Sequence, residues 1–121
     1  MECVKNLQKM RSRVNLNFEY AKEKLYNIIK YLATAKGDMR DRLNVVSVDI
    51  SLLTQDNFPE DIRPDWKFVE EKIYKYPEKL NWNGNRQIMG SIEHSLSRMQ
   101  NRTACKIAEK LFYLWEELET R

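Results

Sequence analysis

The sequence predicts an all-α fold, an antiparallel bundle of about four helices with a long first helix, a long last helix and two shorter ones between. Apolar residues recur at alternating steps of three and four near both ends of the chain. The 121 residues include only three Gly and three Pro, too few for the turns that a run of short strands needs. Hydrophobic residues make up 42% and charged residues 32%. We expect one helical domain over residues 1–121.

The first helix is expected over residues 4–36, because Gly37 can end it by taking a positive φ. Ser12, Asn15 and Asn17 suit an N-cap better than a helix interior. The alternative is therefore a break near Asn15, with the first part folded back onto the last helix. The apolar stripe of this segment consists of Val4, Leu7, Val14, Phe18, Ala21, Leu25, Ile28, Leu32 and Ala35.

The second helix is expected over residues 38–53, with Asp38 as its N-cap. Residues 46–52 also alternate as a strand would, but the helical spacing continues on both sides and favours a helix. The third helix is expected over residues 60–76, since Pro77 closes it.

The last helix is expected over residues 86–119, after a loop centred on the turn-forming pair Asn83-Gly84. A minimal hairpin of residues 80–82 against 86–88 is the alternative for the start of this segment. The apolar stripe of the helix consists of Ile92, Leu96, Met99, Thr103, Ile107, Leu111, Leu114 and Leu118.

The expected helix lengths predict a partner surface. At 1.5 Å per residue the outer helices are about 45–50 Å long and the inner ones about 20–25 Å, so half of each outer helix lacks cover. We expect these halves to pair with a second copy or with a partner's helices. Trp82, in the loop, is either a lid of the core or an exposed anchor. The predicted interface comprises Val4, Leu7, Val14, Leu111, Leu114, Trp115, Leu118 and Trp82.

No residue pattern predicts an enzyme, so we expect no catalytic residue, no cofactor and no metal. His94 is the single histidine, and its neighbours provide neither an orienting carboxylate on the same helix face nor a Gly-rich turn for an oxyanion. The sequence has no Glu-x-x-His, no Cys-x-x-Cys and no phosphate-binding loop.

A nucleic-acid interface is the alternative function. Basic residues step by four along the expected last helix, and such ridges bind phosphate backbones. Glu93 and Glu109 interrupt the ridge, and the net charge of +3 is no nucleic-acid signature by itself. The ridge consists of Arg98, Arg102, Lys106 and Lys110.

The expected localisation is cytoplasmic, without membrane insertion. Cys3 and Cys105 would lie too far apart for a disulfide if the outer helices are antiparallel, which implies a reducing compartment. No apolar run approaches the ~18 residues of a membrane span.

Two segments resemble a pattern found in an uncharacterised family of small bacterial all-helical proteins. These are residues 56–63 with Trp66 and Ile73, and residues 91–99 continuing to 106–114. The resemblance implies a bacterial or mobile-element origin and transfers no active site. We expect a non-catalytic, homodimeric helical module for protein–protein interaction or regulation, in its most specific form an immunity, antitoxin or anti-defence factor.

Overall fold

The computed structural model describes the backbone of residues 2–121 and the side chains of residues 18–121. Most of this part of the chain is helical, which confirms the predicted class in broad terms, and a two-stranded antiparallel sheet is added to it. The elements are α1 (Glu2–Thr34), α2 (Met39–Val45), α3 (Ser47–Ser51), the 3-10 turns η1 (Gln55–Asn57) and η2 (Glu60–Ile62), α4 (Arg63–Ile73), β1 (Lys79–Leu80), β2 (Gln87–Met89), α5 (Ser91–Ser97) and α6 (Asn101–Glu119).

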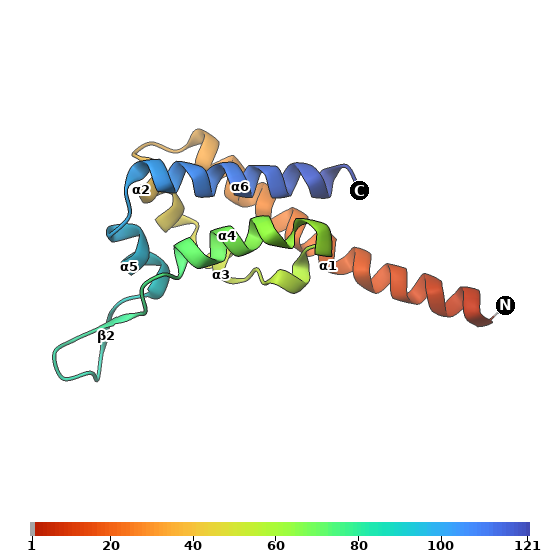
Figure 1. Ribbon diagram of the computed structural model, residues 1–121, viewed down its shortest axis with the longest axis horizontal. Helices are drawn as coiled ribbons and strands as arrows, with labels where there is room; N and C mark the ends of the chain where they lie inside the picture. Colours follow the sequence, from red (N-terminus) through yellow and green to blue (C-terminus); the bar gives the residue numbers. More distant parts are fainter. Residues whose placement is uncertain (1) are drawn as a thin grey trace.

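Helix α6 lies at the centre of the packing. It contacts α1, α4 and α2, and Figure 1 shows it along the top of the molecule with α4 beneath it. Its apolar residues recur every three or four positions, so they form one stripe that faces these neighbours. The buried side chains of this stripe are Ala104, Ile107, Leu111, Leu114 and Leu118.

The core is formed where the stripes of the other helices meet that of α6. Helix α1 adds Ala21, Leu25, Ile28 and Leu32, all buried. Phe58 and Trp66 stack within the core, with 5.1 Å between their ring centroids. The remaining buried hydrophobic residues come from the connecting segments and the shorter helices: Leu43, Val46, Ile50, Leu53, Ile62, Val69, Ile73, Ile92 and Leu96.

The end of α1 follows the sequence prediction closely. Gly37 has a φ of +95°, a conformation that residues with a Cβ rarely adopt. Arg42 donates hydrogen bonds from Nε to the carbonyl of Gly37 and from Nη1 to that of Leu32. Asp38 caps α2 by accepting from the amide of Asp41. The polypeptide therefore reverses tightly between α1 and α2.

The predicted helix over residues 38–53 is wrong as a single helix, because it breaks at Val46 into α2 and α3. Val46 has φ −93° and ψ 14°, outside the helical region. The break keeps Leu43, Val46 and Ile50 buried on the core side, whereas Val48 is exposed. Tertiary packing here outweighs the local preference for one uninterrupted helix, which the apolar spacing predicts. The third helix also differs, since residues 60–62 form a 3-10 turn and α4 ends at Ile73.

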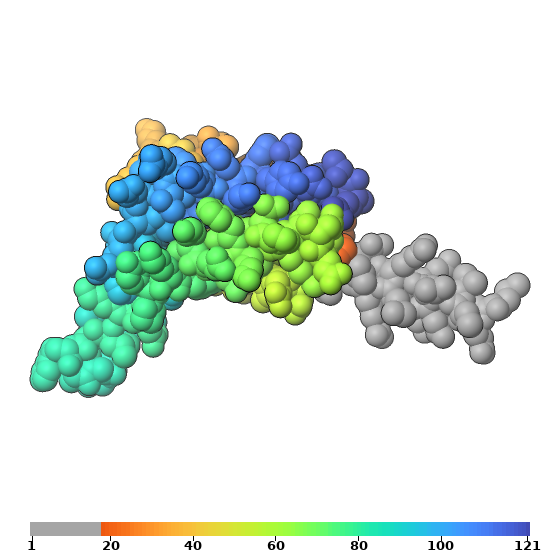
Figure 2. Space-filling view, in the orientation of Figure 1, coloured from red at the N-terminus to blue at the C-terminus, as the bar shows by residue number. Residues whose placement is uncertain are grey.

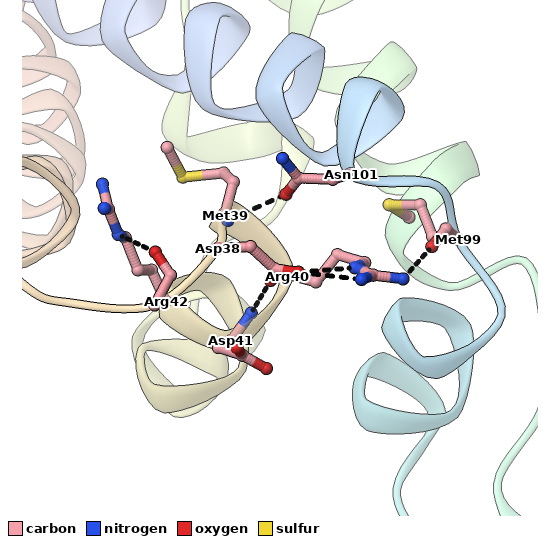
Figure 3. A network of polar contacts seen from close by, with 8 residues as sticks. Asp38, Met39, Arg40, Asp41, Arg42, Met99 and Asn101 are labelled. Carbon is pink, nitrogen blue, oxygen red and sulfur yellow. Dashed lines mark hydrogen bonds and ion pairs between the residues drawn. The ribbon is translucent and has the colours of Figure 1, made fainter.

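The prediction of one helix over residues 86–119 is wrong too. Its start forms the β2 strand, and the helical part is divided into α5 and α6. Figure 3 shows the contacts at this division. Arg40 donates to the carbonyl of Met99, and Asn101 accepts a hydrogen bond from the amide of Met39. Helix α2 thus supplies a partner for the Met99 carbonyl at the break, and the Asn101 side chain in turn supplies a partner for the first amide of α2.

Residues 79–89 form a hairpin, which is the alternative that the Asn83-Gly84 pair allows. Strand β1 pairs with β2 through Lys79 opposite Met89 and Leu80 opposite Gln87. The hairpin projects from the helical body at the lower left of Figures 1 and 2.

Candidate interaction surfaces

Three leucines of the predicted interface lie in the core of the chain itself. Leu111 and Leu114 are fully buried, and Leu118 is 2% exposed. The expectation that they lack cover is therefore wrong. Its cause is the misjudged length of the last helix: α6 has 19 residues, about 28 Å, and α1 and α4 pack along it.

Val4, Leu7 and Val14, also predicted for this interface, lie outside the described side chains. Their pairing with a second copy stays a prediction.

An aromatic surface adjoins this buried stripe, and we define it as Tyr20, Tyr26, Phe112 and Trp115. The ring of Trp115 lies 6.5 Å from that of Tyr26 and 5.9 Å from that of Phe112. Tyr20 and Tyr26 line one shallow groove on α1. Trp115 is partly buried against the core, and its Nε1 has no hydrogen-bond partner within the described part of the chain. The predicted interface residue Trp115 therefore belongs both to the core and to this surface.

Trp82 lies at the opposite end of the molecule, in the turn of the hairpin. It is 95% exposed, so it is not a lid of the core. Leu80 and Ile88, on the two arms of the hairpin, are 43% and 56% exposed. Of the two roles that the sequence leaves open for Trp82, only the exposed anchor is compatible with this position.

The hairpin is held by its own polar contacts rather than by Trp82. The amide of Asn81 donates to the carbonyl of Arg86 at 2.8 Å, and the amide of Gly84 donates to the carbonyl of Asn81 at 3.0 Å. The side-chain oxygen of Asn81 accepts from the amide of Asn85. Gly84 supplies the positive φ, +75°, that the turn requires. The indole of Trp82 is thus presented on a turn whose shape other residues determine.

The four basic residues predicted to form a ridge do not lie on one helix. Arg98 is the C-cap of α5, ahead of the break. Lys110 forms an ion pair with Asp65 of α4, with Nζ 2.9 Å from Oδ1. Arg102 and Lys106 remain exposed on α6. The ridge is wrong as a continuous feature, because the spacing of four presumed one uninterrupted helix.

Arg98 instead meets two lysines that sequence reasoning missed. Lys72, in the last turn of α4, and Lys75, just after that helix, line the same cavity, of about 210 Å³, as Arg98. The ring of Tyr76 lies among them. No local sequence signal could have found this cluster, since Lys75 and Arg98 lie 23 positions apart, on separate elements.

His94 contacts the backbone and an aromatic ring of its own chain. Its Nδ1 lies 2.8 Å from the carbonyl oxygen of Pro77, and its ring is 5.3 Å from that of Tyr76. Because a carbonyl oxygen only accepts, Nδ1 carries the proton in this contact. Hydrogen bonds from Ser91 and Ser95 to the carbonyl of Tyr76 fasten the same segment. His94 therefore helps to hold the start of the hairpin against α5.

Acidic and basic side chains also join the end of the chain to its middle. Arg121 forms an ion pair with Asp61 of η2, and this contact lowers the pKa of the Asp61 carboxyl. The neighbouring Glu117 raises the pKa of the Tyr113 hydroxyl, because its negative charge opposes ionisation. These groups lie on the surface, where ion pairs contribute little to stability.

Comparison with protein-family models, with curated proteins and with solved structures found no match. Across the residues that the structure describes, no three His, Cys, Asp or Glu side chains are grouped as metal ligands. No helix in that same part of the chain has the length and apolar character to span a bilayer.

Proposed function

We propose that this protein is a non-catalytic helical interaction protein that binds another protein through the Trp82 hairpin, residues 79–89. A regulatory factor of the immunity, antitoxin or anti-defence kind acts in this manner, by occupying another protein. A second copy of the chain is the other partner compatible with the proposal, and it would give the homodimer that the sequence predicts.

The observation that carries the proposal is the exposure of Trp82 at 95%. A Trp side chain buries roughly 150–250 Å² when covered, worth about 4–6 kcal/mol at ~25 cal/mol/Å² before ordering costs. Trp is also enriched among the residues that dominate binding energy at protein interfaces. The contribution of Trp82 to folding is small, because its side chain contacts little of its own chain. Binding is thus the role in which this residue contributes most.

The shape of the hairpin supports the same conclusion. Leu80 and Ile88 add exposed apolar area on its two arms, and the element projects from the body so that a partner can reach it (Figure 2). A two-stranded hairpin is marginally stable by itself. Additional contacts from a partner would stabilise it.

The test compares Trp82→Ala with Tyr113→Ala, which removes an exposed aromatic side chain from α6. Light scattering first measures the mass at micromolar and at hundredfold higher concentration. Quantitative capture from an extract of the native host, followed by mass spectrometry, then identifies retained proteins. We expect the wild type and Tyr113→Ala to retain the same partner and Trp82→Ala to bind it at least 30-fold more weakly, about 2 kcal/mol. Equal retention by Trp82→Ala would refute the proposal.

Nucleic-acid binding by α6 is the second candidate. It rests on the exposed pair Arg102 and Lys106, since Lys110 is paired with Asp65. Titration with duplex and single-stranded oligonucleotides at two salt concentrations addresses it, because phosphate-backbone binding weakens steeply with salt. Absence of binding at the lower salt concentration would exclude this function.

A further inference from the structure

The cavity between the end of α4, α5 and the start of α6 is lined by basic groups without acidic ones. Lys72 and Lys75 approach it from the α4 side, and Arg98 approaches it from the end of α5. The rest of its lining is uncharged and includes the ring of Tyr76. Three basic side chains thus line a space of about 210 Å³.

Within residues 18–121 these three charges have no acidic partner, whereas several other basic groups of the surface do. Arg40, Lys110 and Arg121 each form an ion pair with an aspartate. Within residues 18–121, no ion pair neutralises the side chains that line the cavity. Like charges gathered in this way repel one another, so the arrangement favours an anion that would relieve the repulsion.

Aromatic rings position the cationic groups. The Cζ of Arg98 lies 5.0 Å and the Nζ of Lys75 lies 5.8 Å from the centre of the Tyr76 ring. The Nζ of Lys72 lies 5.7 Å from the centre of the Phe68 ring. Such contacts orient a cation and leave its charge in place, so Arg98 and Lys75 are held beside the Tyr76 ring that lines the cavity.

Tyr76 is itself held firmly. Its amide donates to the hydroxyl oxygen of Ser95 at 2.9 Å, and its carbonyl accepts from the hydroxyl of Ser91 at 2.6 Å. Ser95 is 1% exposed and lines the cavity. The wall between the lysines and Arg98 is therefore tied to the core through α5.

We propose that this cavity binds a phosphate monoester group. A phosphate dianion matches a planar guanidinium that binds two oxygens at once together with two ammonium point charges. The volume is below the ~300 Å³ at which sites for whole drug-sized ligands begin, so it suits a terminal group rather than an entire nucleotide. Inorganic phosphate, a small phosphate ester and the 5′-phosphate of a nucleic-acid strand share this chemistry.

The test is a titration of the ¹⁵N-labelled full chain with inorganic phosphate at constant ionic strength, followed by amide chemical shifts. We expect saturable shifts at residues 75–76 and 95–103 in the wild type. The double variant Lys72→Gln/Lys75→Gln should weaken binding by about tenfold or more, as should Arg98→Gln. The control Lys30→Gln/Lys36→Gln removes the same charge from exposed positions elsewhere and should leave binding unchanged.

Two oligonucleotides of identical sequence, one with a 5′-phosphate and one with a 5′-hydroxyl, then distinguish the sources. Tighter binding of the oligonucleotide with the 5′-phosphate would show that the site binds the phosphorylated ends of nucleic-acid strands. Binding of inorganic phosphate with no such preference assigns it to small phosphates and their esters. Equal weakening in the Lys30/Lys36 control, or shifts that do not saturate with inorganic phosphate, would overturn the proposal. Circular dichroism shows whether Arg98→Gln folds. If it does not fold, the lysine variant still tests the proposal, because Lys75 is exposed and its substitution should leave the fold intact.

Discussion

Leu111→Ala is expected to destabilise the folded chain by about 3 kcal/mol. Leu111 is fully buried in the middle of the α6 stripe. The substitution removes buried carbon atoms and leaves a cavity that α1 and α4 can fill only in part, which is the origin of that cost. For a chain of this length the loss corresponds to a fall in Tm of about 12 °C, at roughly 4 °C per kcal/mol.

The assay is urea unfolding followed by far-ultraviolet circular dichroism at two protein concentrations fiftyfold apart. Phe112→Ala is the matched control, since Phe112 is the next residue and is 46% exposed, and we expect a loss below about 1.5 kcal/mol. Burial within one chain requires the loss from Leu111→Ala to be the same at both concentrations. A loss that varies with concentration, or one no larger than that of Phe112→Ala, would refute the assignment of Leu111 to the core of the monomer.

Ser95→Ala should lower the free energy of unfolding, measured with urea, by about 1–2 kcal/mol, because the amide of Tyr76 would lose its buried acceptor. The control Ser97→Ala, which changes an exposed hydroxyl, should lower it by less. A loss no larger than that of Ser97→Ala would contradict this role. Asp38 has a lowered pKa because Arg40 and the amide of Asp41 bond its carboxylate. Its contribution to stability is therefore present above the ordinary value of 3.8 and lost as the pH falls below it. Asp38→Asn keeps a capping side chain, so the urea midpoint of this variant should fall less steeply on acidification than that of the wild type; parallel falls would contradict it.

Local sequence patterns were sufficient to predict several elements of the fold. The stripe through Ala21, Leu25 and Ile28 predicted the buried face of α1, and Gly37 predicted the end of that helix. Asn83-Gly84 correctly predicted a turn. These features depend on neighbours within a few positions, where periodicity, capping and backbone conformation act directly.

The breaks at Val46 and at residues 98–100 could not be predicted in the same way. Neither contains Gly or Pro, and the apolar spacing continues across both. The second break is stabilised by partners far away in sequence, since Arg40 bonds the carbonyl of Met99 and Met39 bonds Asn101. A helix interruption that depends on residues distant in the sequence gives little signal in the neighbouring sequence.

The sequence by itself therefore determined that the chain is largely helical, which residues form the apolar stripes and where the first helix ends. The tertiary structure decided that the stripe of α6 is covered by α1 and α4 of the same chain, that Trp82 is exposed, and that Arg98 shares a cavity with Lys72 and Lys75. The physical reason is that helical periodicity arises within one or two turns. Burial and the convergence of charges are relations between residues that only the folded chain brings together.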